Sequence, residues 1–326
     1  MPYRHAHLYV LCLFPLAGLA FWPGYLGQFA RSPPEFHVHG ATASLWLILL
    51  ILQSLTIQSG RRPLHRSLGL ASLLLFPLFL AGGIGIFIGM AQRFAVQLTP
   101  FHTLYAPRLA WLDLVSVAGF AYFFFEGLRR RRQVNAHSGY MLATAIFLLP
   151  PILGRLVATL PVFAPTGPED FGRLSIAFQV ANAATAAIAF AIAWRSGRHG
   201  RPFWQAGGLT LIAALLFEYP GGALWWHNLY AEFANLPAAP LGLAVAFAGA
   251  KQRAHRDLSH DPVPRKGRLE QLEYARLMVR QERLFHELGS RPCNPGDDRD
   301  DEEQSEADDR KGKKITGRVH YLPFDP

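Results

Sequence analysis

A run of residues without a single charge, LGLASLLLFPLFLAGGIGIFIGMAQ over residues 68–92, decides the fold class of this 326-residue chain. An α-helix rises about 1.5 Å per residue, and a bilayer core of about 30 Å needs roughly 20 apolar residues to be crossed. Residues 68–92 exceed that length. The segment therefore predicts a transmembrane helix, and the small residues in its second half predict close packing against a neighbouring helix.

Comparable apolar segments recur along the first 250 residues and are separated by clusters of proline, glycine and arginine. They predict an all-α polytopic transmembrane helix bundle of about eight spans, with seven spans as the alternative. The expected spans are residues 8–28, 40–59, 68–92, 109–128, 140–163, 174–194, 203–225 and, as the weakest, 233–250. The first segment is expected to stay in the protein, because it is longer than the apolar core of a signal peptide.

Charge divides the chain into two expected domains, residues 1–250 and 251–326. The first contains 16 of the 32 basic residues and only 7 of the 23 acidic residues, so the net charge of +9 belongs to it. A soluble domain of that size would need far more charge on its surface. The arginines lie between apolar runs rather than along one helix face, which argues against a nucleic-acid partner. Two isolated cysteines, Cys12 and Cys293, exclude a disulfide framework.

The arginines also predict an orientation, because Lys and Arg in short loops are retained on the cytoplasmic side of a membrane. With the N-terminus inside, eleven arginines of the first domain fall in inside segments and four fall outside. We therefore expect a multi-pass protein of a bacterial inner (plasma) membrane with a cytoplasmic N-terminus. An eighth span would return the C-terminal tail, residues 251–326, to the cytoplasm as well.

The tail is densely charged. Leucines among alternating charges predict an amphipathic helix over residues 266–289, and the low hydrophobicity that follows predicts that residues 290–326 are mostly disordered. A cytoplasmic protein partner of this tail is one expected function of the second domain.

Histidines are concentrated at the ends of the expected spans and fall into two layers. One layer lies at the cytoplasmic ends of the first, third and fifth spans, and the other at the outer ends of the second, fourth and seventh. The cytoplasmic layer contains His5, His7, His65 and His137, and the outer layer contains His37, His39, His102 and His227. Neutral imidazoles on neighbouring helices are the ligands that a haem iron takes axially, so each layer could hold one haem.

Two motifs in this region resemble those of an uncharacterised family of bacterial multi-spanning membrane proteins. The first runs from His39-Gly through Gln53 to Gly60-Arg61 and His65-Arg-Ser-Leu-Gly69, and the second joins a run of four arginines to His137-Ser-Gly-Tyr-Met141. The match covers residues 37–145, less than half of the chain.

The alternating histidines also resemble, more distantly, the di-haem transmembrane cytochrome b group. In that group one haem is bound by the second and fourth core helices and the other by the third and fifth. The resemblance implies that His39 and His102 share one haem b, and that His65 and His137 share the other. The haem would be bound non-covalently, because the chain has no Cys-x-x-Cys-His motif.

Ionisable and amide side chains inside the expected spans form a second candidate site, since such residues are costly in a bilayer and are usually paired. Helix arithmetic places them in one layer of the outer half of the membrane. This intramembrane polar layer consists of Asp113, Arg155, Gln179, Asn182 and Glu218. Its simplest role is to clamp helices together through an ion pair of Arg155. It could also bind a quinone, an anion or another small polar ligand.

Three functions remain open from the sequence. The leading one is non-covalent haem binding with electron transfer across the membrane. The second is a non-catalytic membrane protein that carries or gates a small polar solute at the intramembrane layer, and the third is a scaffold that recruits a partner through its tail. No nucleotide-binding or hydrolase motif lies in a suitable context, so the sequence does not decide whether the protein is an enzyme.

Overall fold

The computed structural model describes residues 3–165 and 171–236, and every regular element within them is helical. The α-helices are α1 (Ala6–Leu11), α2 (Leu13–Phe21), α3 (Pro34–Gln58), α4 (Arg62–Ala95), α5 (Pro100–Arg129), α6 (Val134–Ala143), α7 (Leu149–Ala158), α8 (Gly172–Arg195), α9 (Arg201–Glu218) and α10 (Leu224–Glu232). Short 3-10 helices are η1 (Leu26–Arg31), η2 (Thr144–Leu148), η4 (Gly197–His199), η5 (Pro220–Gly222) and η6 (Phe233–Asn235). The all-α prediction is confirmed for this part of the chain.

Five helical segments are long and apolar enough to cross a membrane: Pro34–Gln58, Arg62–Ala95, Pro100–Arg129, Val134–Ala158 and Gly172–Arg195. A sixth is obtained if Arg201–Gly222 and Leu224–Asn235, which are bent by 94° at their junction, count as one span. These segments match six of the eight predicted spans. The described residues include only the first four residues of the predicted eighth span, 233–250. The tail lies outside them, and with it the predicted helix 266–289 and the predicted disordered segment 290–326.

The predicted first span, residues 8–28, is shorter in the structure. The apolar helix Ala6–Phe21 ends well before residue 28, and its length is about 24 Å. Pro23 and Gly24 follow it. Proline has no N–H to donate and glycine is a poor helix former, so the chain leaves the helix here and forms the short helix η1 instead.

Prolines at the first helical positions explain where several spans begin. Helices α3, α4, α5 and α9 each carry a proline there, which is favourable because the missing N–H has no partner at a helix start in any case. Helix α5 consequently starts at Pro100, nine residues before the predicted span 109–128, and it includes Arg108 within its length. The tight turn between α3 and α4 is made by Gly60, which has a φ of 72° that a residue with a Cβ rarely adopts.

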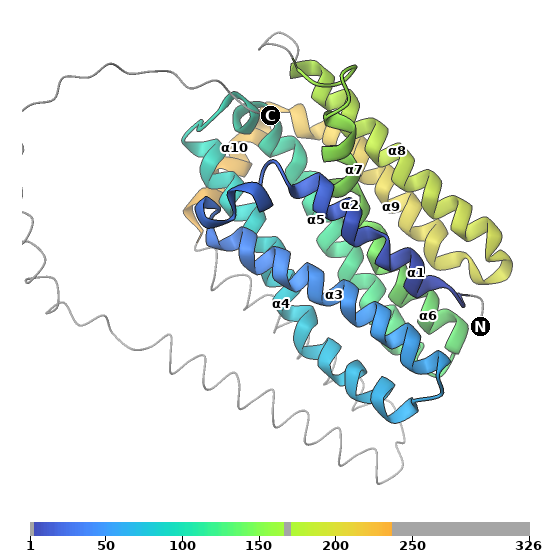
Figure 1. Ribbon diagram of the computed structural model, residues 1–326. Coiled ribbons are helices and arrows are strands. Elements are labelled where there is room, and N and C mark those ends of the chain that lie inside the picture. The colour runs from blue at the N-terminus through green and yellow to red at the C-terminus, as the bar shows by residue number, and fades with distance from the viewer. Residues whose placement is uncertain (1–2, 166–170, 237–326) are drawn as a thin grey trace, which may run out of the picture. The chain divides into compact units, whose positions relative to one another are not determined.

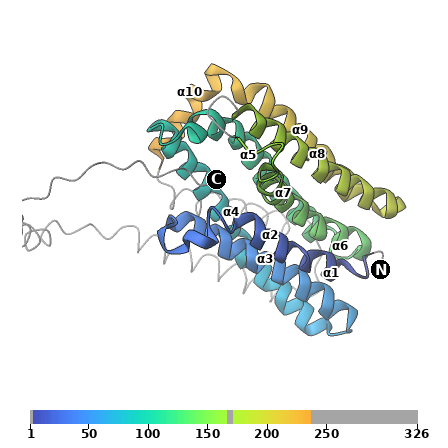
Figure 2. The same cartoon turned by 45° about the horizontal axis from the view of Figure 1, so that its top comes forward.

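The helices form an antiparallel bundle in which α5 has a central place. Helix α3 packs along α4, α8 packs along α9, and α5 contacts both α4 and α9. The short helices α1 and α2 pack against α3 and α7 respectively. Figure 1 shows α1 and α2 lying along the bundle, and in Figure 2 α3 and α4 (blue to cyan) lie on one side of it and α8 and α9 (yellow) on the other.

The centre of the bundle is filled by aromatic side chains. Trp46, Phe76, Phe120, Phe123 and Phe124 are all at most 2% exposed. Their rings are in contact, with centroids 4.1 Å apart for Phe76 and Phe124 and 4.8 Å apart for Trp46 and Phe120. Rings packed at such distances exclude water, so the two ends of the bundle are separated by a dry, apolar layer.

Candidate functional site

The structure brings His65 and His137 together. His65 lies in the first turn of α4 and His137 in the first turn of α6, and both side chains are half-buried. The centroids of their rings are 6.4 Å apart, and the ring planes are nearly perpendicular, at 83°. We call this end of the bundle the basic end, because it includes Arg61, Arg62, Arg66 and Arg129 to Arg132.

Backbone carbonyls orient both rings. The Nδ1 atom of His137 lies 2.8 Å from the carbonyl oxygen of Gly127, and that of His65 lies 3.3 Å from the carbonyl oxygen of Gln53. A carbonyl oxygen only accepts hydrogen bonds, so Nδ1 is the protonated nitrogen of each ring. In the neutral imidazoles Nε2 therefore keeps its lone pair. A hydrogen bond of this kind from Nδ1 to a carbonyl is how proteins commonly orient metal-ligating histidines.

The surroundings of the pair leave one polar atom without a partner. The Oε1 atom of Gln53 is buried and has no hydrogen bond. Gly69 lies one turn after His65 on the same side of α4, and a Cβ at Gly69 would meet only the Gln53 Nε2 atom, at 3.6 Å. Gly69 thus adds no side-chain bulk beside His65, and it lies near an unused hydrogen-bond acceptor.

Among the described residues, no group of three or more His, Cys, Asp or Glu side chains is arranged to hold a metal ion. An iron at His65 and His137 would therefore have to bring equatorial ligands of its own, as it does in a porphyrin. Neutral imidazoles such as those of His65 and His137 are donors that a porphyrin iron would accept. The residues present fit a haem better than a directly coordinated ion.

At the opposite end of the bundle, His39 is isolated from other histidines. Its ring stacks on Phe79 with centroids 5.4 Å apart, and its Nδ1 atom is buried without a hydrogen-bond partner. The backbone of His39 lies directly on Gly82 of α4, where a Cβ would come within 2.9 Å of the His39 Cα. His39 lies against Gly82, which is 17 residues after His65 on α4. The layers of His39 and His65 are therefore separated by about 26 Å along that helix.

The expected pairing of His39 with His102 differs from what the structure shows. A Cβ at Gly83 would lie 4.0 Å from the His39 ring and 3.4 Å from Val117, so His39 lies level with Val117 of α5. His102 is 15 residues before Val117, about 22 Å along that helix. Instead, His102 completes the start of α5, where its Nδ1 atom is 2.7 Å from the Thr99 hydroxyl. The reason is that α5 extends beyond the apolar segment from which the pairing was predicted.

The other histidines of this end have local roles. His37 Nδ1 lies 3.0 Å from the hydroxyl of Tyr25 in the segment between α2 and α3. Partial burial raises the pKa of the Tyr25 phenol. His227 donates from Nε2 to the carbonyl oxygen of Gly221, 3.0 Å away, and so secures the bend between α9 and α10.

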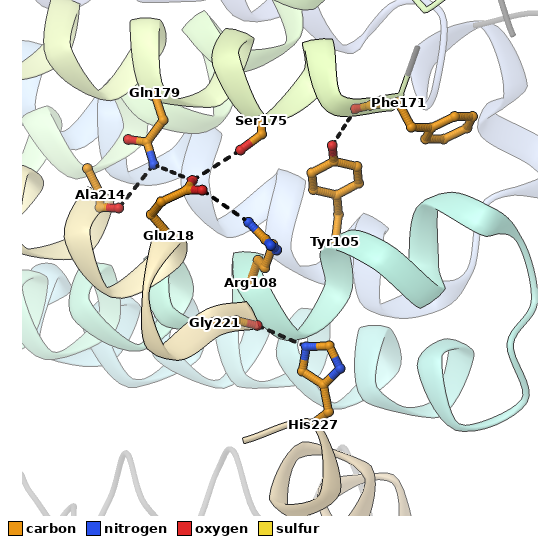
Figure 3. A network of polar contacts seen from close by, with 9 residues as sticks. All are labelled: Tyr105, Arg108, Phe171, Ser175, Gln179, Ala214, Glu218, Gly221 and His227. Carbon is orange, nitrogen blue, oxygen red and sulfur yellow. Dashed lines mark hydrogen bonds and ion pairs between the residues drawn. The ribbon is translucent and has the colours of Figure 1, made fainter. Parts of the chain in front are cut away.

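The predicted intramembrane polar layer separates into two groups. In the first, Glu218 of α9 accepts hydrogen bonds from Ser175 and Gln179 of α8, both at 3.2 Å. Its other carboxylate oxygen lies 3.5 Å from the Arg108 guanidinium of α5. Figure 3 shows this carboxylate between its three partners, with His227 and Gly221 beyond Arg108. The group ties α5, α8 and α9 together, which matches the clamp expected from the sequence, but its cation is Arg108.

Arg155 and Asp113 form the second group. Arg155 makes no ion pair within 4 Å among the described residues; its guanidinium donates to the carbonyl oxygen of Pro151 and lies 4.4 Å above the Phe21 ring. Its charge acts on both Asp113 and His39. Asp113 itself lies one turn before Val117, the α5 residue that is level with His39. Asn182 belongs to neither group, because its amide donates to Phe178 of its own helix.

No match to this chain is found among protein-family models, curated proteins or solved structures. The geometry of the two histidine layers and of the two polar groups is therefore the basis for assigning a function.

Arg108 is the site residue that the sequence analysis missed. It precedes the apolar segment of α5, and a positive charge at the edge of a span is read first as a loop residue. The signal that could have identified it is Pro100. A proline at the first position of a helix moves the predicted start of α5 outward and brings Arg108 into the bundle.

Proposed function

We propose that this protein binds a single b-type haem non-covalently through His65 and His137 and transfers electrons across the membrane in which it is embedded. The observation that carries the proposal is the separation of 6.4 Å between the two imidazole rings. A metal–nitrogen bond of about 2 Å on each side, added to the ring radii of about 1.1 Å, gives a separation of about 6 Å for two imidazoles on one metal.

The chain's own residues would perform three tasks. His65 and His137 would hold the iron through Nε2, while the carbonyl oxygens of Gln53 and Gly127 keep both rings in the tautomer that can coordinate. Arginines at the basic end, among them the neighbouring Arg66, supply cations for the two carboxylates that a b-type haem carries. The haem itself supplies an iron that takes up and releases one electron.

The aromatic centre of the bundle favours electron transfer over the alternative function, the passage of a small polar solute. A solute crossing the bundle would have to lose its hydration between Trp46, Phe76 and Phe120, where the indole N–H of Trp46 is already bonded to Thr144 and cannot replace the water. Glu218 is engaged with three partners and serves as a clamp. The further alternative, a scaffold acting through the tail 251–326, concerns residues outside those described. A bacterial inner membrane and a cytoplasmic N-terminus remain part of the proposal.

An absorbance spectrum of the protein purified in detergent tests the proposal. The oxidised and dithionite-reduced spectra should differ by the sharp reduced band of a b-type haem. His65→Ala and His137→Ala should each abolish or strongly diminish that band, whereas His102→Ala and His227→Ala, which alter histidines at the opposite end of the bundle, should retain it.

A rescue experiment separates loss of a ligand from loss of the fold. In His65→Gly, free imidazole added to the detergent solution should restore the band, since the carbonyl of Gln53 still faces the vacated space. A colourless preparation from haem-sufficient cells, or a band that persists in both histidine variants, would contradict the proposal and would favour the solute function instead.

A further inference from the structure

Among the described polar side chains at the end of the bundle opposite His65 and His137, three ionisable ones have hydrogen-bonding capacity that their contacts leave unused and are not held in an ion pair. They are His39 of α3, Asp113 of α5 and Arg155 of α7. The haem proposal assigns no role to any of them. Ionisable groups at membrane depth are unfavourable without partners, so a set of three that do not pair with one another is unlike a structural clamp.

His39 offers a nitrogen that is prepared for a ligand. Its Nδ1 atom is buried and has no hydrogen bond, although its ring is fixed by stacking on Phe79. A buried nitrogen without a hydrogen-bond partner is unfavourable, and a ligand bound at that nitrogen would recover the lost free energy. The fixed ring also means that little side-chain freedom is lost on binding.

Asp113 lies one turn before Val117, the α5 residue level with His39, and therefore on the same face of that helix. Within the described residues its carboxyl group makes no hydrogen bond and no ion pair shorter than 4 Å, and the side chain is only half-buried. Its charge interacts with that of Arg155 through space. A molecule reaching Asp113 would thus meet a free acceptor opposite a cation.

Arg155 opens the group to the outside of the bundle. Its side chain is exposed, with the guanidinium lying above the ring of Phe21 in α2. Beside Phe21, the side chains of Leu19 and Trp22 are 67% and 64% exposed. An apolar surface of this kind at membrane depth faces lipid, so a ligand can approach Arg155 directly from the bilayer.

The combination of groups selects the ligand's chemistry. An anion such as phosphate would be attracted by Arg155 and repelled by Asp113, and a cation would be treated in the opposite way. A neutral ring that carries oxygens at two positions fits all three groups. In its oxidised form the carbonyl oxygens accept hydrogen bonds from Arg155 and His39, and in its reduced form a hydroxyl donates to Asp113.

We propose that His39, Asp113 and Arg155 form the binding site for the ring of a lipid-soluble quinone or its quinol. The alkyl tail of the quinone lies along the lipid-facing surface of α2, beside Leu19 and Trp22. The site is separated by the aromatic centre from His65 and His137, and it does not depend on haem being bound there.

Equilibrium binding of a para-benzoquinone with a short alkyl tail tests this site. The full-length protein is placed in nanodiscs of phosphatidylcholine, and bound quinone is measured above the amount that partitions into empty discs of the same lipid. Saturable binding of one quinone per chain is expected. Asp113→Asn and Arg155→Gln should each weaken quinone binding about tenfold. Glu218→Gln is the control and should leave binding unchanged, because the Glu218 carboxylate lies at the same end of the bundle but is engaged with Ser175, Gln179 and Arg108.

The double variant His65→Ala, His137→Ala separates this test from that of the haem. It should lose the haem band and keep quinone binding, so either proposal can fail alone. Arg155→Lys, which keeps the charge, should bind more tightly than Arg155→Gln and shows that the fold is intact. The proposal would be overturned by partitioning of the quinone without saturation, or by equal binding to the wild type and to Asp113→Asn. Displacement of the quinone by phosphatidylglycerol would also overturn it, and would identify a lipid headgroup as the ligand instead.

Discussion

At the scale of single residues, the centre of the bundle depends on one hydrogen bond between helices that are distant in sequence. The indole Nε1 of Trp46 in α3 donates to the hydroxyl of Thr144, 3.0 Å away, and that hydroxyl in turn donates to the carbonyl oxygen of Met141. Both side chains are completely buried. The bond fixes the orientation of Trp46, against which Phe79, Phe120 and Phe124 pack.

Replacing Thr144 by valine should destabilise the protein, because the indole N–H of Trp46 would remain buried without an acceptor. The expected loss is about 1–3 kcal/mol. It should appear as a melting temperature several degrees lower in detergent, whereas Thr144→Ser, which keeps the hydroxyl, should melt close to the wild type. Equal melting of the valine and serine variants would show that the hydrogen bond contributes nothing.

The histidines show what can be predicted at this scale. The sequence places His65 and His137 at the same end of the bundle, and their rings lie 6.4 Å apart because each begins a helix there. The haem that the resemblance assigns to them stays a prediction. The sequence does not predict the position of His102 relative to His39. That position depends on how far α5 extends beyond its apolar segment, and hydropathy alone carries no information about such an extension.

At the scale of helices, α3 and α4 are held together by a close approach of their backbones. A Cβ placed at Gly82 would come within 2.9 Å of the Cα and 3.2 Å of the backbone nitrogen of His39. Backbone atoms cannot move aside as the end of a flexible side chain can. Glycine is therefore required for these two helices to pack at this distance.

Gly82→Ala should accordingly force α3 away from α4 and cost about 1–3 kcal/mol through overpacking. Gly208→Ala in α9 is the matched control, because a Cβ there meets nothing within 4 Å, and alanine is the better helix former. We expect a lower melting temperature for Gly82→Ala and an unchanged or higher one for Gly208→Ala. The reverse order would mean that the α3–α4 contact is not close-packed.

Helix positions were largely predictable from the apolar segments, and their interruptions were predictable from proline and glycine. The 3-10 helix η2 immediately before Pro150 and Pro151 and the sharp bend at Pro220-Gly-Gly are such interruptions. The size of the bend was not predictable. It is fixed by contacts far apart in sequence, such as the hydrogen bond from the indole of Trp226 to the carbonyl oxygen of Pro107.

At the scale of the whole bundle, the arginine asymmetry predicts which end faces the cytoplasm. The turn between α3 and α4, next to Arg61 and Arg62, and the segment before α3, next to Arg31, lie at opposite ends of α3. They should be exposed on opposite sides of the membrane.

Cysteine labelling tests this orientation in a Cys12→Ser, Cys293→Ser background. A membrane-impermeant maleimide should label Ser32→Cys in cells whose outer barrier is opened but whose inner membrane is intact. It should label Ser59→Cys only after the inner membrane is permeabilised. The opposite pattern would reverse the predicted orientation without affecting the helical bundle, and labelling of both positions from one side would contradict α3 as a transmembrane helix.

The number and spin state of iron atoms per chain test the central claim most directly, since a shared iron between His65 and His137 must be six-coordinate. We predict about one haem iron per chain of purified protein, with the electron paramagnetic resonance spectrum of a low-spin ferric centre that has two axial imidazoles. Either His65→Gly or His137→Gly should remove that low-spin signal. Protein without iron, or iron that is high-spin in the wild type, would contradict the account.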